Sequence, residues 1–144
     1  MKNVTELLKS KPERAMVTVK PDDTVLDAIK ILAREDIGAA VVVSGDRLVG
    51  IFSERDYTRK VVLKGRHSES TKVEEIMTAN VVCVSPRAKT RDCMALMSEK
   101  NIRHLPVVEE GRVVGMVSIR DIVTDIIADQ DFTISQLEHY ISGQ

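Results

Sequence analysis

The sequence contains few of the residues on which reactive sites and disulfide-bonded domains depend. Its 144 residues include no tryptophan, two cysteines and three histidines, and aromatic residues make up only 3% of the chain. Cys83 and Cys93 are spaced neither as metal ligands nor as a disulfide framework, and both fall where the pattern predicts apolar positions. We interpret them as reduced core residues of a cytoplasmic protein, and we predict no metal site.

An excess of charge of one sign is also missing. The formal net charge is -1 and the pI is near 6.3, so the chain has no long-range field that would attract nucleic acid. Any bound anion therefore has to be held by individually placed Arg, Lys or His groups. The first residues lack the apolar run of a signal peptide, and no stretch approaches a membrane span. We expect a soluble protein with no nucleic-acid or membrane partner.

The sequence shows no catalytic constellation. No His, Cys or Ser is placed with a base and an orienting partner, and no cluster of metal ligands stands out. We therefore predict that the protein is not an enzyme.

An internal duplication dominates the sequence. Residues 17–57 and 82–122 align without a gap at an offset of 65 residues. The identical pairs include Val19/Val84, Pro21/Pro86, Asp27/Asp92, Ile37/Ile102, Arg47/Arg112 and Gly50/Gly115. A unit of roughly 60 residues buries only about 60% of its surface, so we expect the two copies to pack face to face and complete each other's core.

Each copy is expected to be an α/β unit with the order strand, helix, strand, strand, helix. In the first copy Thr24 can cap a helix, and the apolar residues 37–43 predict a buried strand. A turn at 44–46 should return the chain as an antiparallel strand, and a second helix should run from Arg55 to about Gly65. The second copy repeats this order.

The chain divides into four predicted parts. Repeat 1 with its lead-in covers 1–65, a polar linker covers 66–72, repeat 2 covers 73–130, and an amphipathic helix covers 131–144. In that last helix Thr133 and Gln136 are spaced as a capping box, and Ile134, Leu137 and Ile141 share one face. This face needs a surface to cover, either the flank of its own module or a second subunit.

Each copy ends in a Ser-x-Arg-Asp quartet where a strand passes into a helix, at Ser53 and at Ser118. A helix start exposes backbone N–H groups and the positive end of the helix dipole, which favour a phosphate. Asp56 and Asp121, each with two acceptor oxygens, suit the vicinal hydroxyls of a ribose. Ser-x-x-Asp is equally the pattern of a helix capping box, and the residues alone leave both interpretations open.

The repeated pattern resembles a known family. An apolar-x-Val-x-Pro segment, a helix, a strand rich in valine, and the sequence Arg-apolar-Val-Gly-apolar-apolar-Ser-x-Arg-Asp occur twice between about residues 4 and 128. This is similar to a pair of cystathionine beta-synthase (CBS) domains, also called a Bateman module. The resemblance implies two tandem repeats packed about a pseudo-twofold axis, with two clefts between them that bind AMP, ADP, ATP, NAD or S-adenosylmethionine. Among these we favour AMP.

The resemblance also implies the contact residues of both clefts. Asp56 and Asp121 would hold ribose hydroxyls, and the Ser and Arg of each quartet would hold phosphate. The residues of cleft 1 would be Val17, Thr18, Gly38, Ala39, Ala40, Ser53, Arg55 and Asp56. The residues of cleft 2 would be Met77, Thr78, Val82, Arg103, His104, Leu105, Pro106, Ser118, Arg120 and Asp121.

The two clefts are not expected to be equivalent. Where the first offers the small residues Gly38 and Ala39, the second offers the cationic residues Arg103 and His104. We expect the first to admit a bulkier adenosine compound, and the second to prefer a compact phosphate ligand. The lead-in to repeat 1 is four residues longer than the lead-in to repeat 2, and Lys9, Lys11 or Arg14 could supply charge at the first cleft.

The resemblance further implies a homodimer that signals to an unknown effector protein in trans. We expect the dimer interface to form from the helices at 55–64 and 120–128, because both are rich in apolar residues. The alternative is a structural dimerisation module whose clefts bind nothing and whose quartets only cap helices.

Overall fold

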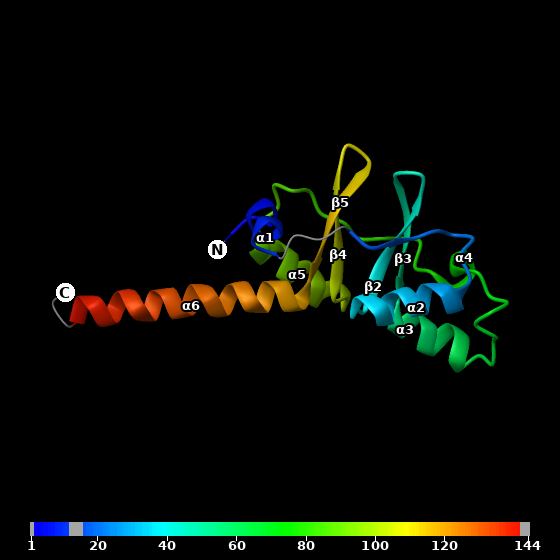
Figure 1. Cartoon of the computed structure of the whole chain (residues 1–144). Helices are drawn as coiled ribbons and strands as arrows, with labels where there is room; N and C mark the ends of the chain where they lie inside the picture. The colour runs from blue at the N-terminus through cyan, green and yellow to red at the C-terminus, as the bar shows by residue number, and fades with distance from the viewer. Residues whose placement is uncertain (1, 12–15, 142–144) are drawn as a thin grey trace.

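The structure is a computed structural model that describes residues 2–11 and 16–141, the side chains of residues 140 and 141 excepted (Figure 1). The first repeat contains β1 (Thr18–Val19), α2 (Val25–Glu35), β2 (Ala39–Ser44), β3 (Arg47–Ser53), α3 (Glu54–Tyr57) and the π-helical turn η1 (Thr58–Val62). The second contains α5 (Thr90–Lys100), β4 (His104–Glu109), β5 (Arg112–Ser118) and α6 (Ile119–Ile141). A short helix precedes each repeat, α1 (Val4–Ser10) and α4 (Val73–Ile76).

The predicted α/β duplication is confirmed down to its backbone details. Thr24 caps α2 by accepting a hydrogen bond from the Asp27 backbone N–H, as expected. The helices α2 and α5 end at Asp36 and Asn101, which occupy equivalent positions and are both left-handed, with φ of 54° and 53°. Asp and Asn enter this region more readily than other residues that carry a side chain.

The two copies differ at their first strand. In the first, β1 pairs in parallel with β2. In the second, the equivalent segment forms only an isolated bridge between Val84 and Val107. The strand predicted at this position in the second repeat is therefore reduced to a single bridge.

The sheet consists of two hairpins that meet at one point. Its strand order is β1-β2-β3-β5-β4, and β3 and β5 pair only through Arg47 and Arg112 at the turn ends of the hairpins (Figure 1). Both hairpins carry a register shift at the same place, between Val42 and Val43 in one and between Val107 and Val108 in the other. The similarity of the two hairpins agrees with the pseudo-twofold relation expected from the sequence.

Each hydrophobic core is completed by the lead-in helix of the other repeat. Val73 and Ile76 of α4 are fully buried in the core of repeat 1, with Val25, Leu32 and Phe52. Conversely, Val4 and Leu7 of α1 are buried in the core of repeat 2, with Leu105, Val117 and Ile122. The two lead-in helices are thus exchanged, and neither core is complete without the other half of the chain.

Close backbone approaches fix this exchange. A Cβ atom at Gly50 of β3 would lie 2.5 Å from the Met77 Sδ, and one at Gly115 of β5 would lie 2.9 Å from the Leu8 Cδ1. Each glycine follows a valine, Val49 or Val114, at equivalent positions of the two repeats. Glycine is needed at these two positions because the lead-in segment of the opposite repeat occupies the space that a side chain would take.

The linker at 66–72 is mostly exposed, but two of its backbone carbonyls, at Ser68 and Thr71, accept hydrogen bonds from the start of α2. Thr71 is 2% exposed, and its backbone carbonyl accepts a 2.8 Å hydrogen bond from the Val25 N–H at the start of α2. Its hydroxyl donates to the carbonyl of His67.

The separate C-terminal helix predicted from residue 131 is not observed, because α6 runs without interruption from Ile119 to Ile141. Thr133 is an interior residue of this helix, and its hydroxyl donates to the Asp129 carbonyl rather than capping a helix start. Of the apolar residues predicted to share a face, Ile134 and Leu137 are both exposed, and the side chain of Ile141 lies outside the described residues. A threonine hydroxyl bonded four residues back is compatible with a continuous helix, which the sequence pattern could not distinguish from a cap.

The cysteine prediction is correct for one residue. Cys93 is buried in α5, and burial raises the pKa of its thiol, so it is a weak nucleophile at neutral pH. Cys83 is exposed, because the segment around it is not a regular strand. Within the described part of the chain, no helix has both the length and the apolar content required to cross a bilayer.

The exchange of lead-in helices predicts a large effect of Leu7→Ala on stability. Leu7 is 3% exposed in the core of repeat 2, so its truncation should lower the free energy of unfolding by about 2–4 kcal/mol. Urea denaturation followed by circular dichroism measures this. Lys9→Ala, at an exposed position on the same helix, is the control and should change stability by less than about 0.5 kcal/mol. Equal effects of the two variants would show that α1 is not part of the core.

Candidate functional site

Both quartets form reciprocal capping boxes at the junctions predicted from the sequence. Between β3 and α3, the Asp56 backbone N–H donates to Ser53 Oγ at 3.1 Å, and the Ser53 N–H donates to Asp56 Oδ2 at 3.1 Å. Between β5 and α6, the Asp121 N–H donates to Ser118 Oγ at 3.2 Å, and the Ser118 N–H donates to Asp121 Oδ2 at 2.8 Å. These bonds satisfy donors that a helix start leaves unpaired, and they fix the position of both carboxylates.

At the first of these sites, both carboxylate oxygens of Asp56 already have partners. Oδ2 accepts hydrogen bonds from the backbone N–H and the hydroxyl of Ser53. Oδ1 lies 3.0 Å from the Lys60 Nζ and 3.4 Å from the Thr78 hydroxyl. Asp56 is only 8% exposed. A ligand that approaches this carboxylate has to share it with Lys60.

At the second site, the carboxylate of Asp121 is more open. Lys11 Nζ lies 3.0 Å from Oδ2 and also donates to the Met116 carbonyl at 2.9 Å. Every hydrogen bond that Asp121 accepts from the described residues goes to Oδ2. Oδ1 therefore has no partner within the described part of the chain.

The structure corrects the assignment of the lead-in residues. Met77 and Thr78 were predicted in cleft 2, but Thr78 exchanges backbone hydrogen bonds of 2.9 Å with Ile51 of β3 and lies beside Asp56. Lys11 was considered for cleft 1, but it contacts Asp121 in repeat 2. Both corrections follow from the exchange of the lead-in segments. Arg14 lies outside the described residues.

His104 lies between the two halves of the molecule. It is paired with Ser118 across the β4–β5 hairpin, and the space beside Gly38 of the first repeat is filled by His104 and Glu54, 3.8 Å from a Cβ added there. The space beside Gly38 is thus bordered by a side chain of each repeat. Burial lowers the pKa of His104, with smaller lowering effects from Lys11 and Arg103, while Asp121 acts in the opposite direction. His104 is consequently neutral at pH 7.

The remaining predicted contact residues fall into two groups. The side chains of Ala40 and Leu105 belong to the two hydrophobic cores, and Ala39 and Pro106 are buried beside them, so a ligand could reach only their backbone. The accessible members are Thr18, Arg55, Arg103 and Arg120, which are exposed, and Val17 and Val82, which are partly buried. Arg55 lies in the first turn of α3 and Arg120 in the first turn of α6, and both side chains are exposed.

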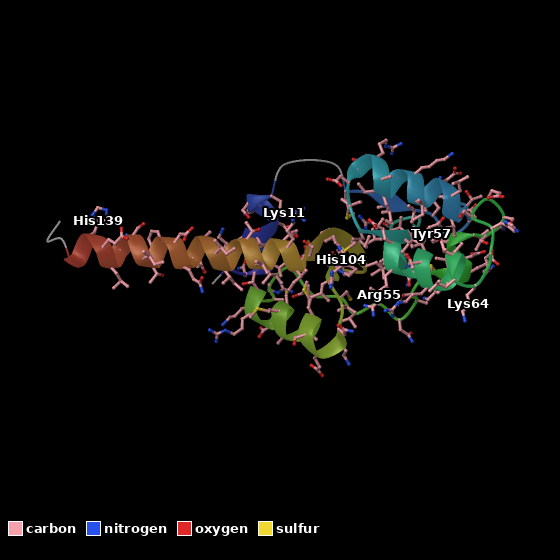
Figure 2. The ribbon with its side chains drawn as sticks, turned by 90° about the horizontal axis from the view of Figure 1, so that it is seen from below. Lys11, Arg55, Tyr57, Lys64, His104 and His139 are labelled. Carbon is pink, nitrogen blue, oxygen red and sulfur yellow. The ribbon has the colours of Figure 1, made fainter. Side chains whose placement is uncertain are left out.

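The Asp121 site combines cations with a titratable imidazole. Lys11 lies 3.0 Å from Asp121 Oδ2, and Lys11, Arg103 and Asp121 are all near enough to shift the pKa of His104. Figure 2 shows Lys11 and His104 near the start of α6, and His139 toward the far end of that helix. Such a group can hold a phosphate through the cations while the carboxylate accepts hydroxyl hydrogen bonds.

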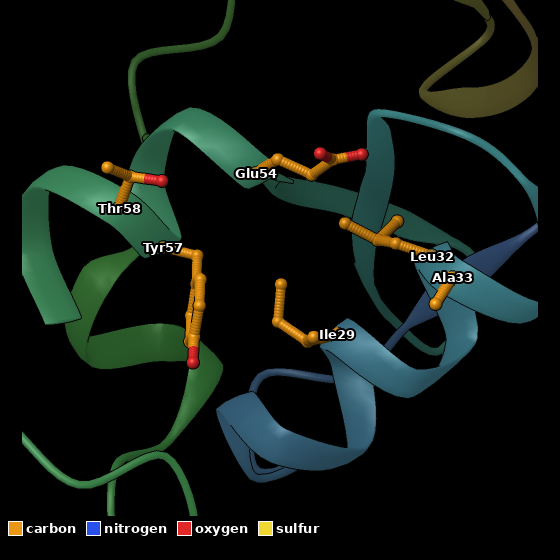
Figure 3. A pocket seen from close by; sticks show the side chains of 6 residues that line it. All are labelled: Ile29, Leu32, Ala33, Glu54, Tyr57 and Thr58. Atoms are coloured by element: carbon orange, nitrogen blue, oxygen red, sulfur yellow. The ribbon is translucent and has the colours of Figure 1, made fainter. Parts of the chain in front are cut away.

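A hollow of about 390 Å³ lies elsewhere, between α2 and the α3–η1 segment (Figure 3). Its lining residues are Ile29, Leu32, Ala33, Glu54, Tyr57 and Thr58. None of them is a predicted ligand contact. One of the elements that line the hollow, the α3–η1 segment, lies in the helix at 55–64 that the sequence predicted as part of a dimer interface.

Sequence reasoning missed Lys60 and considered Lys11 for the other cleft. Lys60 could have been found, because it stands four residues after Asp56 on one helix, a spacing that brings side chains together. The position of Lys11 could not, because its contact with Asp121 spans 110 residues and depends on the exchanged lead-in.

Comparison with known proteins places this geometry in a family. The family model described as CBS domain matches residues 4–63 and 73–128. The chain is 39% identical, over 97% of its length and 72% of the relative, to the mitochondrial CBS domain-containing protein CBSX3 of Arabidopsis thaliana. It is also similar to a solved structure of a protein with CBS domains from Burkholderia ambifaria MC40-6, with 52% identity, a TM-score of 0.85 and coverage of 90% of this chain and 96% of that one.

Two similar structures contain adenosine compounds. One is a CBS domain protein from Pyrobaculum aerophilum complexed with AMP, with 28% identity, a TM-score of 0.73 and coverage of 83% of this chain and 88% of that one. The other is the CBS domain pair of protein MJ0100 in complex with 5′-methylthioadenosine and S-adenosyl-L-methionine, with 26% identity, a TM-score of 0.77 and coverage of 90% and 98%.

The capping boxes predict that Ser53→Ala and Ser118→Ala each destabilise the protein, whether or not a ligand binds. Each change removes the oxygen that accepts the bond from the helix N–H, which should cost about 1 kcal/mol in the free energy of unfolding. Urea denaturation measures the loss. Ser98→Ala, at an exposed position of α5, is the matched control and should have no measurable effect. If the quartet variants were as stable as the control, the caps would contribute nothing.

Proposed function

The chain belongs to the CBS domain family, and from this membership we propose that it is a regulatory module that binds an adenosine nucleotide and signals its bound state to a partner protein. Family members that stand alone are regulatory rather than catalytic, and two similar structures hold adenosine compounds. The observation that carries the proposal is the Asp121 site, where a fixed carboxylate with one open oxygen is surrounded by Lys11, His104 and Arg103.

The proposed ligand of the Asp121 site is AMP. The ribose hydroxyls donate to Asp121, chiefly to the open Oδ1, and the Ser118 hydroxyl lies beside them. The single phosphate lies against Arg103, Arg120 and the imidazole of His104, where charge-assisted hydrogen bonds are strongest. Val82 provides the apolar wall for the adenine. ADP, ATP, NAD and S-adenosylmethionine are the competing ligands, and each adds bulk or charge beyond the ribose.

The Asp56 site is proposed to bind the same class of ligand more weakly. Lys60 and Thr78 already occupy Asp56 Oδ1, and Lys60 also donates to the Ile76 carbonyl at 3.0 Å. A ribose at this site has to displace these partners, and the cost of displacement lowers the affinity. Val17, Thr18, Arg55 and Met77 are the accessible side chains around it.

We also propose that the module works as a homodimer. The helical face after each quartet exposes large apolar side chains, among them Val62, Leu63, Val123 and Ile127, of which Leu63 is 72% exposed. Exposed apolar groups gathered on one face of a small module usually mark association. The partner that receives the signal is proposed to be a separate protein in trans. A cytoplasmic location is also proposed, because both cysteines are free thiols.

A second candidate function is a structural interaction module that binds no ligand. The observation that favours it is that both quartets are complete capping boxes, which gives their Ser and Asp residues a role without a nucleotide. The two candidates differ in what a change of Asp121 does. A cap affects only stability, whereas a ribose contact affects affinity as well.

Calorimetric titration with AMP decides between them. The parent should bind AMP, and Asp121→Asn should weaken the binding about ten- to hundredfold, because a charged acceptor of ribose hydroxyls is lost. Asp56→Asn should change the tighter binding event little. Asp131→Asn, exposed on α6, is the control and should bind as the parent does. Titration of ADP, ATP, NAD and S-adenosylmethionine ranks the alternatives. Absence of binding by any of them at millimolar concentration would support the structural module instead.

AMP binding is expected to tighten as the pH falls from about 7 to about 6. His104 is neutral in the free protein because burial lowers its pKa, and a bound phosphate favours the protonated imidazole and so raises that pKa in the complex. AMP binding is therefore coupled to protonation of His104 at pH values between its pKa in the free protein and its pKa in the complex. The affinity stops rising near pH about 6, where the phosphate itself is protonated. Calorimetry at several pH values measures the effect, and His104→Ala should flatten it. An equal pH dependence in this variant would exclude His104 from the phosphate site.

A further inference from the structure

The outer half of α6 is exposed to solvent. Every residue from 130 to 139 is exposed, and the helix extends well beyond the body of the protein (Figures 1 and 2). Helices of this length are marginal in water on their own and owe most of their stability to packing of an apolar face. The outer half of α6 therefore requires a surface that the described part of this chain does not provide.

The apolar residues of this helix form a regular stripe. Val123, Ile127, Ile134 and Leu137 are 45%, 52%, 52% and 56% exposed. They follow one another at intervals of four, seven and three residues, and Gln130 divides the interval of seven into three and four. We call these five residues the α6 seam. Alternating steps of three and four residues are the spacing of a coiled coil, with Ile127 and Ile134 at a positions and Val123, Gln130 and Leu137 at d positions.

The seam is distinct from the face that α6 turns toward its own module. Ile122 and Asp125 are 0% and 4% exposed and face the body. The seam residues lie about 100° around the helix from Ile122, since successive residues are about 100° apart. Phe132 is 66% exposed and lies on the side opposite the seam. The seam is therefore available for an interaction that leaves the module's own packing intact.

We propose that the α6 seam pairs with the seam of a second copy of this chain, as a parallel two-stranded coiled coil. A β-branched residue at the a positions together with leucine at a d position favours two parallel strands. Ile127, Ile134 and Leu137 match this preference. Gln130 adds one polar residue in the middle of the seam, at a d position, where the two glutamine side chains of a parallel, in-register pair can hydrogen-bond to each other.

The charges beside the seam select the parallel orientation. Asp131 and Glu138 occupy e positions, whereas the g positions are held by Ile126 and Thr133, which carry no charge. In a parallel pair each e position meets a g position of the other helix, so no like charges come together. In an antiparallel pair e positions meet e positions, and Asp131 would face Glu138 of the second copy. The acidic residues thus disfavour the antiparallel arrangement.

The coiled coil would place the ligand site at its base. Asp121 and Val123 are two residues apart at the start of α6, so the Asp121 site lies within one helical turn of the first seam residue, on the other side of the helix. The seam is also continuous with the apolar face proposed for the module dimer, since Val123 and Ile127 belong to both. The inference does not depend on nucleotide binding, and its test leaves the quartets unchanged.

Disulfide cross-linking tests the pairing and its orientation. In a Cys83→Ser background, which removes the exposed native thiol, Gln130→Cys should form a cross-linked dimer rapidly under mild oxidation. Helices that are parallel and in register bring both Gln130 and Leu137 to their own counterparts, within the short distance that a disulfide requires. An antiparallel pair can do so at only one of these positions, so the proposal requires Leu137→Cys to cross-link as well. Phe132→Cys, on the opposite side of the helix, is the matched control and should cross-link at least tenfold more slowly.

A second pair of variants separates the seam from chance collision. Ile134→Asp with Leu137→Asp should abolish the cross-link at Gln130→Cys, whereas Phe132→Asp should leave it unchanged. Equal cross-linking at positions 130 and 132, or a monomer by light scattering at micromolar concentration, would overturn the proposal. So would persistence of the cross-link in the Asp double variant. Helical content by circular dichroism shows whether each variant still folds, and AMP titration of the same variants reports on the nucleotide site separately.

Discussion

The exchange of the two lead-in helices is the contact on which the rest of the molecule depends. α1 completes the core of repeat 2 and α4 completes the core of repeat 1, through Val4 and Leu7 in one case and Val73 and Ile76 in the other. Each repeat is too small to bury enough surface alone. The exchange makes the two halves one cooperative unit, so the position of one repeat relative to the other is fixed by packing as well as by the single bridge between β3 and β5.

The same exchange supplies both sites with residues from the opposite end of the chain. It brings Thr78 to Asp56 and Lys11 to Asp121, and because the two lead-ins differ in sequence, the sites differ in charge. A ligand at Asp121 necessarily changes the surroundings of Lys11. Lys2, at the other end of α1, lies 3.4 Å from the buried Asp125 of α6. The lead-in is thus tied at both ends to the first two turns of the helix that projects from the module.

The sequence was sufficient to predict the structural elements that occur in both repeats. The hairpins, the capped helices and the quartets at the strand-to-helix junctions lie where local patterns predicted them, because capping and strand alternation depend on residues close together in the chain. The contact of Lys11 with Asp121 could not be predicted, because it spans 110 residues and depends on the exchange of the lead-ins, which no local pattern encodes. Thr78 is 22 residues from Asp56 in the chain and reaches it through the same exchange. His104 lies beside Gly38 because β4 of the second repeat approaches the first repeat there, a contact that no local pattern encodes either. The pattern predicted a separate helix from residue 131, because Thr133 and Gln136 have the spacing of a capping box. The same spacing occurs inside a continuous helix, as it does here in α6.

Capping and ligand binding are compatible roles for the same carboxylate. The two hydrogen bonds between Ser118 and Asp121 fix the carboxylate through Oδ2 and leave Oδ1 without a bond to Ser118. The cap therefore holds Oδ1 in place before any ligand binds. A contact that is already ordered loses less entropy on binding than a free side chain would. At Asp56 the same cap is present, but Lys60 neutralises the remaining oxygen. The difference between the two sites therefore arises from the cation beside each carboxylate: Lys60 comes from the helix that Asp56 itself begins, and Lys11 comes from the exchanged lead-in. Lys60 is beside Asp56 whenever that helix is folded, whereas Lys11 reaches Asp121 only when α1 is packed into the core of repeat 2, so the charge of the Asp121 site depends on the exchanged lead-in.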